Sequence, residues 1–404
     1  MQGREQLWEG DGSVGEEGEL KSEATPAASW KSAGEVGRVF LWIGTVGFGG
    51  PAALIALMHS EIVERRKWLS EQQFADLYGA TNLIPGPNAM EMALHVGLSR
   101  GGWAGFFASG AGFALPAVTI VSVLAALYVR FGGLPAVSWL LYGIKPVVIA
   151  LILQALWNLG KTVFKRWLLA AIGLAVLGLF FLRVNEIALL FGGGLLVMLV
   201  EQARRKSPPK AASFVPLLGL GAPALAAVPY SASTLFFSFL KIGGLLYGTG
   251  YVLLAFLRPE FVLRLGWLTD QQLLDAVAIG QVTPGPFFST AAFIGYLKGG
   301  LAGAALGALG IFLPSFVYVA ATHAWVERAR SLPWAASLLD GVNATSLGLM
   351  AAVTVELGQG AFVDPVAMAI GLLAFVLLMR WKVNPSWLIL AGAVIGLVRW
   401  LIGL

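Results

Sequence analysis

Long apolar stretches separated by short polar loops recur along almost the whole chain after residue 35. A helix that crosses a bilayer needs about 20 mainly apolar residues. We therefore expect an all-α, polytopic membrane protein with about 13 transmembrane helices. The expected spans are 36–57, 74–98, 101–128, 134–158, 167–183, 186–202, 212–230, 233–257, 271–297, 301–325, 334–357, 362–379 and 385–403.

The second half of the chain repeats the first. "WLSEQQFAD" from Trp68 returns as "WLTDQQLLD" from Trp267, and each copy is followed by a Pro-Gly-Pro triplet. We expect homologous repeats at 36–204 and 231–404, joined by a linker at 205–230 that carries one span. When the chain crosses the membrane an odd number of times between corresponding positions of the two repeats, the second repeat has the opposite orientation in the membrane, as in many secondary transporters.

Loop charges support an inverted arrangement. Cytoplasmic loops are enriched in Lys and Arg, and the charged loops of the two repeats have opposite parity. With 13 spans they fall on one side, together with the N-terminus. The clusters are Lys161, Lys165 and Arg166; Arg204, Arg205, Lys206 and Lys210; Arg258 and Arg264; Arg328 and Arg330; and Arg380 and Lys382. The cluster of Arg65, Arg66 and Lys67 disagrees, and its side stays open.

Composition narrows the class of protein further. Only 12% of the residues are charged, against about a quarter in soluble domains. Cysteine is absent and three histidines lie far apart in sequence, so we expect no metal, no other cofactor and no enzymatic site. The net charge of +5 fits cytoplasmic loops rather than nucleic-acid binding. Residues 1–35 are acidic and rich in Gly and Ser, and we expect a disordered cytoplasmic tail.

The Pro-Gly-Pro triplets interrupt two expected spans. Proline removes a backbone donor and clashes with the preceding turn, so each triplet separates two half-helices. Irregular backbone survives in a membrane where protein or a water-filled cavity satisfies it. A half-helix that begins at the break points free N–H groups at the membrane centre, which favours an anion. The glycine-rich clusters "FGGP" at 48–51 and "YGTG" at 247–250 predict a second pair of breaks. The alternatives are a simple kink at the triplets and close helix packing at the glycines.

Polar residues within the spans are the candidate site residues, because each is costly unless it lines a cavity or has a partner. Glu91 and His95 are candidates for proton coupling, with a structural pair as the alternative. Lys145 and Lys241 are candidate cations for a dianion, and snorkelling to the interface is their alternative. The full set of expected substrate-binding residues is Phe48, Gly49, Gly50, Pro51, Asn82, Pro85, Gly86, Pro87, Asn88, Lys145, Lys241, Thr283, Pro284, Gly285, Pro286, Ser289, Thr290 and Asn343.

Several segments together resemble the chromate ion transporters. These are "FGGPAALIALMHSEIVERRKWLSEQQFADLYGATNLIPGPNAMEMALHVGL" in the first repeat, and "GWLTDQQLLDAVAIGQVTPGPFFSTAAFIGYL" and "GIFLPSFVYVAATH" in the second. The resemblance implies a two-domain transporter of the bacterial inner membrane that exports chromate by proton antiport, confers chromate resistance and also handles sulfate. Relatives often carry histidine after "FGGPAA", where this chain has Leu54.

The leading hypothesis from the sequence is a proton-coupled exporter of tetrahedral oxyanions, with chromate, protons and the lipid bilayer as partners. A homodimer is an open alternative to a single chain. A passive oxyanion channel, a sulfate uptake transporter and a membrane-embedded enzyme are the rival functions.

Overall fold

The computed structural model describes residues 30–82, 84–164, 166–204, 228–246, 250–323 and 333–403. These residues form helices and no strands, which confirms the all-α membrane fold with two repeats. Five of the helices are long and apolar enough to cross a membrane. Most of the expected span at 212–230 and most of "YGTG" lie outside the described residues, so the count of 13 spans is not confirmed.

The helices of the first repeat are α1 (Trp30–Val46), α2 (Gly50–His59), the π-helix η1 (Ser60–Arg65), α3 (Glu71–Thr81), α4 (Asn88–Phe131), α5 (Pro135–Val163), α6 (Trp167–Phe181) and α7 (Glu186–Arg204). Those of the second are α8 (Ala232–Leu245), η2 (Gly250–Leu253), α9 (Leu254–Leu257), η3 (Arg258–Arg264), α10 (Asp270–Val282), η4 (Phe287–Ser289), α11 (Thr290–Thr322), α13 (Pro333–Ala361), α14 (Pro365–Arg380) and α15 (Pro385–Leu401).

The expected spans 36–57 and 74–98 are not crossings but re-entrant hairpins. α1 runs inward and stops at the glycines before α2, which leads back out, so that Arg66 after η1 reaches Glu35 near the start of α1 at 3.3 Å. α3 then runs inward to the Pro-Gly-Pro break, and the first part of α4 returns. At its end the Arg100 guanidinium lies over the Trp68 ring, 5.5 Å from its centre. Hydropathy could not separate two half-helices from one full crossing.

A sharp reversal at Gly102 divides α4 into a short returning part and a long crossing part. Gly102 has φ 59°, and a Cβ at Gly97 would lie 2.5 Å from the carbonyl oxygen of Gly105. Only glycines permit the two parts to pack this closely. The crossing part, from residue 103 to 131, is about 43 Å long at 1.5 Å per residue, enough to traverse the bilayer.

The second repeat has the same construction. Gly300 reverses α11 with φ 57°, and Gly295 and Gly303 make the equivalent backbone contact. Both α3 and α10 begin with a capping box, built by Ser70 and Gln73 in one and by Thr269 and Gln272 in the other. The sequence repeat is therefore a repeat of local structure.

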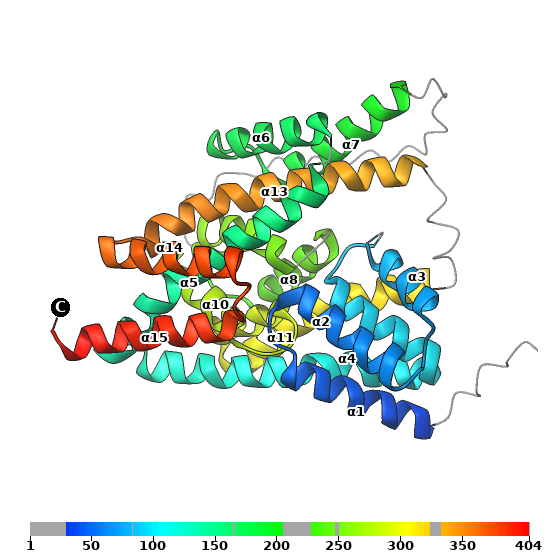
Figure 1. The fold of residues 1–404 in the computed structure, drawn as a ribbon, viewed down its shortest axis with the longest axis horizontal. Coiled ribbons are helices and arrows are strands. Elements are labelled where there is room, and N and C mark those ends of the chain that lie inside the picture. The colour runs from blue at the N-terminus through cyan, green and yellow to red at the C-terminus, as the bar shows by residue number, and fades with distance from the viewer. Residues whose placement is uncertain are drawn as a thin grey trace, which may run out of the picture.

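The two repeats are inverted. We call the end of the bundle where α1 begins the α1 face, and the opposite end, where α8 begins, the α8 face. The crossing part of α4 ends with Tyr128 against Phe293 of the second repeat, with ring centres 5.3 Å apart. The crossing part of α11 ends with His323 against His95 of the first. Since each crossing helix ends beside the hairpin of the other repeat, they run antiparallel. In Figure 1, α1 begins on the right and the C-terminus lies on the left.

Helices α5, α6, α7, α13, α14 and α15 pack beside this centre (Figure 1). Glycines permit close contacts, as where Gly143 of α5 meets Gly392 of α15. At the α8 face, Asp364 caps α14 and pairs with Arg399 of α15 at 2.6 Å. Burial alone would raise the pKa of Asp364, but hydrogen bonds from the Ala367 amide and from the Tyr142 and Arg399 side chains lower it to about 2.

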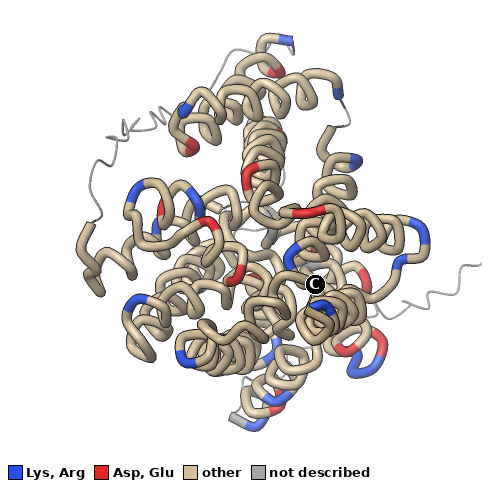
Figure 2. The backbone as a smooth tube through the Cα atoms, turned by 90° about the vertical axis from the view of Figure 1, so that its left-hand side faces the viewer, with Lys and Arg blue, Asp and Glu red and all other residues tan. Residues whose placement is uncertain are grey.

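The re-entrant hairpins change the sides assigned to two charged clusters. Arg65, Arg66 and Lys67 follow a hairpin that returns, so they lie on the α1 face. Arg258 and Arg264 lie on the α8 face for the same reason. The loop charges placed them on the same side as the N-terminus, and that prediction was wrong. Both are neutralised locally, Arg258 by Asp270 and Glu356, and Arg264 by Glu260. Figure 2 looks along the bundle from the end that carries the C-terminus and shows few charges along the helices.

Candidate functional site

The breaks of the two repeats meet each other. The Gly86 amide donates a hydrogen bond to the Leu246 carbonyl at 2.7 Å, and the Gly285 amide donates to the Gly47 carbonyl at 2.9 Å. Each Pro-Gly-Pro break is thus joined to the end of the first helix of the other repeat. Gly86 and Gly285 have φ values of 137° and 90°, which favour glycine. The two central amides are therefore satisfied by protein and do not themselves point free N–H groups at a ligand.

A buried carboxylate lies against the first break. A Cβ built on Gly86 would lie 2.1 Å from Glu91 Oε1 and 2.6 Å from Ser315 Oγ. Glu91 and Ser315 are 0% exposed, and among the described residues neither Glu91 oxygen nor the Ser315 hydroxyl has a hydrogen-bond partner. An unpaired acid inside a membrane protein is costly, which points to a functional role.

Amide side chains surround the same break. Asn88 donates to the Asn82 side-chain oxygen at 2.7 Å, and Asn82 donates to the Tyr78 carbonyl at 3.0 Å. The Asn88 side-chain oxygen is buried without a hydrogen-bond partner. α4 begins at Asn88, and the amides of Met90 and Glu91 in its first turn donate to the Pro87 carbonyl of the break, at 2.8 and 3.2 Å.

The second break is similar in backbone but less polar. A Cβ at Gly285 would meet the Gly44 carbonyl oxygen at 2.8 Å and the Ala117 side chain at 3.0 Å. Ala117 occupies the position that Ser315 has at the first break. Ser289 is buried and its hydroxyl has no hydrogen-bond partner, whereas Thr290 bonds to the Phe287 carbonyl in its own helix. The two breaks thus differ in side chains, not in architecture.

Two histidines distant in sequence are neighbours in the fold. His95 Nδ1 and His323 Nδ1 lie 2.9 Å apart, with stacked rings whose centres are 5.2 Å apart. His95 is completely buried, and its Nε2 has no hydrogen-bond partner within the described part of the chain. His95 therefore pairs with His323 of the other repeat rather than with Glu91. Among the described residues, no group of three or more His, Cys, Asp or Glu could hold a metal ion.

Lys145, predicted to face the substrate, forms a buried ion pair. Its Nζ lies 2.7 Å from Asp275 Oδ1, and the two side chains are 6% and 5% exposed. The Tyr128 hydroxyl donates to Asp275 Oδ2 at 2.7 Å. The positive charge of Lys145 is balanced within this triad of α4, α5 and α10, and a direct substrate contact stays a prediction.

The other predicted site residues are spread more widely. Lys241 pairs with Glu260 at 2.5 Å, Thr283 donates to the Ile279 carbonyl, and Asn343 is half-buried on α13. Phe48 and Gly49 lie in the gap between α1 and α2, where Gly49 has φ 106°. The substrate contacts predicted for these five residues stay predictions.

Sequence reasoning missed Ser315, His323, Asp275 and Tyr128. Asp275 carried the clearest signal, since it is an acid within an apolar run, "LLDAVAIG". His323 and Ser315 lie in the second repeat, and only the packing of α11 on α4 brings Ser315 to the first break and His323 to His95. No spacing within the chain could have indicated that contact.

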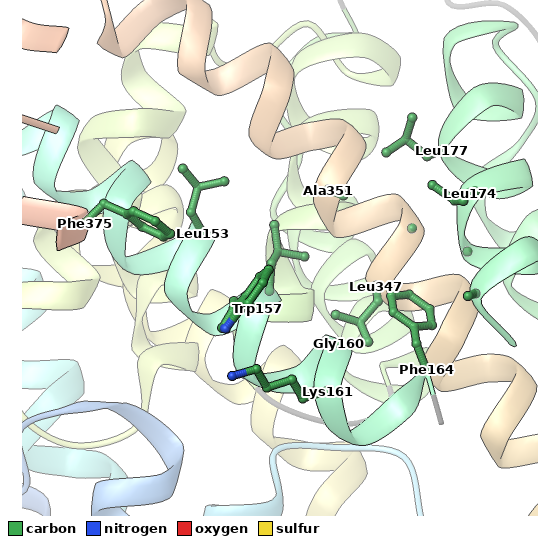
Figure 3. A pocket seen from close by; sticks show the side chains of 14 residues that line it. Leu153, Trp157, Gly160, Lys161, Phe164, Leu174, Leu177, Leu347, Ala351 and Phe375 are labelled. Carbon is green, nitrogen blue, oxygen red and sulfur yellow. The ribbon is translucent and has the colours of Figure 1, made fainter. Parts of the chain in front are cut away.

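The large apolar pocket between α5, α6, α13 and α14 is a different feature. It has a volume of about 600 Å³ and is lined mainly by leucine, glycine and aromatic side chains. Figure 3 shows Trp157 and Lys161 at this pocket, where the Lys161 ammonium lies over the Trp157 ring. Its walls suit hydrocarbon rather than a dianion, so the candidate site is the pair of breaks.

Inverted repeats, interrupted helices that meet inside the bundle and a buried acid define a class, that of polytopic membrane transporters. The chain belongs to the chromate transporter family, whose model matches residues 34–198 and 233–397. The two matched segments correspond to the two structural repeats.

Curated relatives are similar over most of their length. A probable chromate transport protein of Synechococcus elongatus is 32% identical over 394 residues, covering 93% of this chain and 97% of the relative. The chromate transport protein of Cupriavidus metallidurans is 32% identical over 372 residues, covering 89% and 92%. That of Pseudomonas aeruginosa is 33% identical over 398 residues, covering 90% and 91%. No solved structure matches the chain.

Proposed function

We propose that this protein exports chromate across the bacterial inner membrane in exchange for protons, with sulfate as a second tetrahedral dianion that the same site accepts. The observation that carries the proposal is the unpaired Glu91 carboxyl group at the Gly86 break, beside the first amides of α4. The relatives named as chromate transport proteins support the choice of anion.

Competition between the ionised Glu91 carboxylate and the oxyanion for this break would couple oxyanion transport to protonation. Glu91 Oε1 lies where helix-terminal amides favour negative charge. An ionised carboxylate there occupies the place proposed for the oxyanion and repels it. Protonation neutralises Glu91 and permits the dianion to take its place. The proton and the dianion are then bound at the same time, so movement in opposite directions requires that the proton reaches and leaves Glu91 by a path different from that of the dianion.

Charge distribution supports a cytoplasmic α1 face. The positive side chains at that face include Arg65, Arg66, Lys67, Arg100, Lys161, Arg166, Arg204, Arg380 and Lys382. The positive-inside bias then places the beginning of α1, and the N-terminus before it, in the cytoplasm. Rocking of the hairpins of one repeat against the crossing helix of the other would expose the break to each face alternately.

Chromate flux in proteoliposomes tests the proposal. We expect wild-type chromate efflux to increase when a pH gradient is imposed, and Glu91→Gln to keep downhill flux but to lose its response to the gradient. Glu64→Gln is the matched control, because Glu64 is 61% exposed. Equal responses of the wild type and Glu91→Gln would contradict proton coupling at Glu91. Unsaturable flux would indicate a channel, and transport of sulfate without chromate would reassign the substrate. Loss of chromate resistance in cells that express Glu91→Gln would support export.

A further inference from the structure

The histidine pair lies between the buried acid and one face of the protein. Glu91 and His95 are four residues apart and share one side of α4, with His95 farther from the break. His323 lies at the end of α11, where the helix reaches the α1 face, and is half-buried. The polar groups Glu91, His95 and His323 thus form a file from the centre of the protein to the α1 face.

The Nδ1 contact has a chemical requirement. Two ring nitrogens 2.9 Å apart form a hydrogen bond only when one carries a proton and the other offers a lone pair. When both rings are neutral, they are therefore in opposite tautomers with respect to Nδ1. A proton that enters one ring at Nε2 can leave the other ring at Nε2, which is the arrangement of a proton relay.

The equivalent positions of the other repeat contain no ionisable side chain. Phe293 aligns with His95, and Ala125 aligns with His323. Since the surrounding backbone is repeated at both faces, the architecture alone does not require the histidines. Their presence at one face only indicates a function that the α1 face alone performs.

We propose that His95 and His323 conduct protons between Glu91 and the α1 face, by a path separate from that of the oxyanion. This inference rests on the proposed exchange of oxyanion for protons. The proton of the Glu91 carboxyl group passes to His95 Nε2 when the two groups come into contact, because they form no hydrogen bond in the described structure. His95 Nδ1–H then passes a proton to His323 Nδ1, and His323 Nε2–H releases one to water. Glu91 is left ionised, both rings are neutral, and one proton has reached the α1 face. Each ring has changed tautomer, and before the next proton each ring returns to its starting tautomer by losing a proton at one ring nitrogen and gaining one at the other, in exchange with water.

The other ionisable side chains on the helices around His95 have partners of their own. Tyr318 of α11 donates its hydroxyl proton to the Gly244 carbonyl at 3.0 Å. Glu35 of α1 lies between Arg66 and Arg100 at the surface. Asp76 of α3 accepts hydrogen bonds from Gln72. His323 is thus the titratable group in contact with His95.

The test separates proton-driven transport from exchange of oxyanion alone. Reconstituted wild type, His323→Gln and His95→Gln are compared in two assays, chromate efflux driven by a pH gradient and chromate–chromate exchange without a gradient. General acid–base groups contribute about 100-fold or more, and we expect pH-driven efflux to fall at least about 10-fold in both variants. Exchange should be unchanged. His59→Gln is the matched control, because His59 pairs with Glu71 outside the file.

Each other outcome overturns the relay. If wild type responds to the pH gradient and His323→Gln responds equally, the proton takes another path. If His323→Gln loses exchange as well, the pair is structural. If wild type itself shows chromate transport without any response to the gradient, the proposed proton coupling fails, and the relay fails with it.

Discussion

The buried triad of Lys145, Asp275 and Tyr128 permits a quantitative prediction. Removing one member of a buried ion pair leaves an uncompensated charge and costs about 3–5 kcal/mol, whereas replacing both by apolar residues is often neutral or stabilising. Lys145 and Asp275 are 6% and 5% exposed and 2.7 Å apart. We expect Lys145→Met and Asp275→Leu each to lower the free energy of unfolding by about 3–5 kcal/mol. The double variant should recover most of the loss, because no buried charge then remains.

Thermal and denaturant unfolding in detergent, followed by tryptophan fluorescence, measures this cycle. The same four proteins are assayed for chromate flux. Single variants as stable as the wild type would refute the assigned burial of the pair. A double variant that recovers both stability and flux would show that Lys145 serves the fold alone. Recovery of stability without flux would support the predicted contact between Lys145 and the substrate.

Two further predictions concern the break and the α8 face. Gly86→Ala combines a backbone angle unfavourable for alanine with a clash against Glu91, and we expect destabilisation of about 2–5 kcal/mol and loss of chromate flux. Gly300→Ala has similar backbone strain but no atom within 4 Å of the new Cβ, so it should keep flux; equal loss in both would contradict a role of the clash. The lowered pKa of Asp364, about 2 against an ordinary 3.8, stabilises the fold above about pH 4, and this contribution is lost as pH falls toward 2. Hydrogen exchange at the start of α14 should rise over that range in wild type but not in Asp364→Asn, and identical profiles would argue against the Asp364–Arg399 pair.

Local patterns predicted the parts of the site that one repeat contains. The Pro-Gly-Pro breaks follow from the missing proline donors, and the spacing of Asn88, Glu91 and His95 placed them on one side of a helix. The path of the chain was harder to predict, because a hairpin of two half-helices has the same hydropathy as a crossing. That error placed Arg258 on the wrong side and left the side of Arg65 open.

Contacts between the repeats could not be predicted from either repeat alone. Ser315 reaches the first break, and His323 reaches His95, because the crossing part of α11 packs antiparallel on α4. Likewise, the partner of Lys145 is on α10, in the other repeat. Each of these contacts depends on tertiary packing and leaves no periodic signal in the sequence.

The difference between the two breaks accounts for the proposed proton coupling better than their similarity does. An internal repeat supplies two equivalent breaks, and the reciprocal hydrogen bonds of Gly86 and Gly285 bind them into one unit. Two buried acids in that unit would repel each other and the dianion alike. With the single acid Glu91, protonation changes the charge of the first break and leaves the charge of the second break unchanged. In the proposed mechanism, symmetry gives the two faces similar access, and the one asymmetric carboxyl group gives the cycle its exchange of ions.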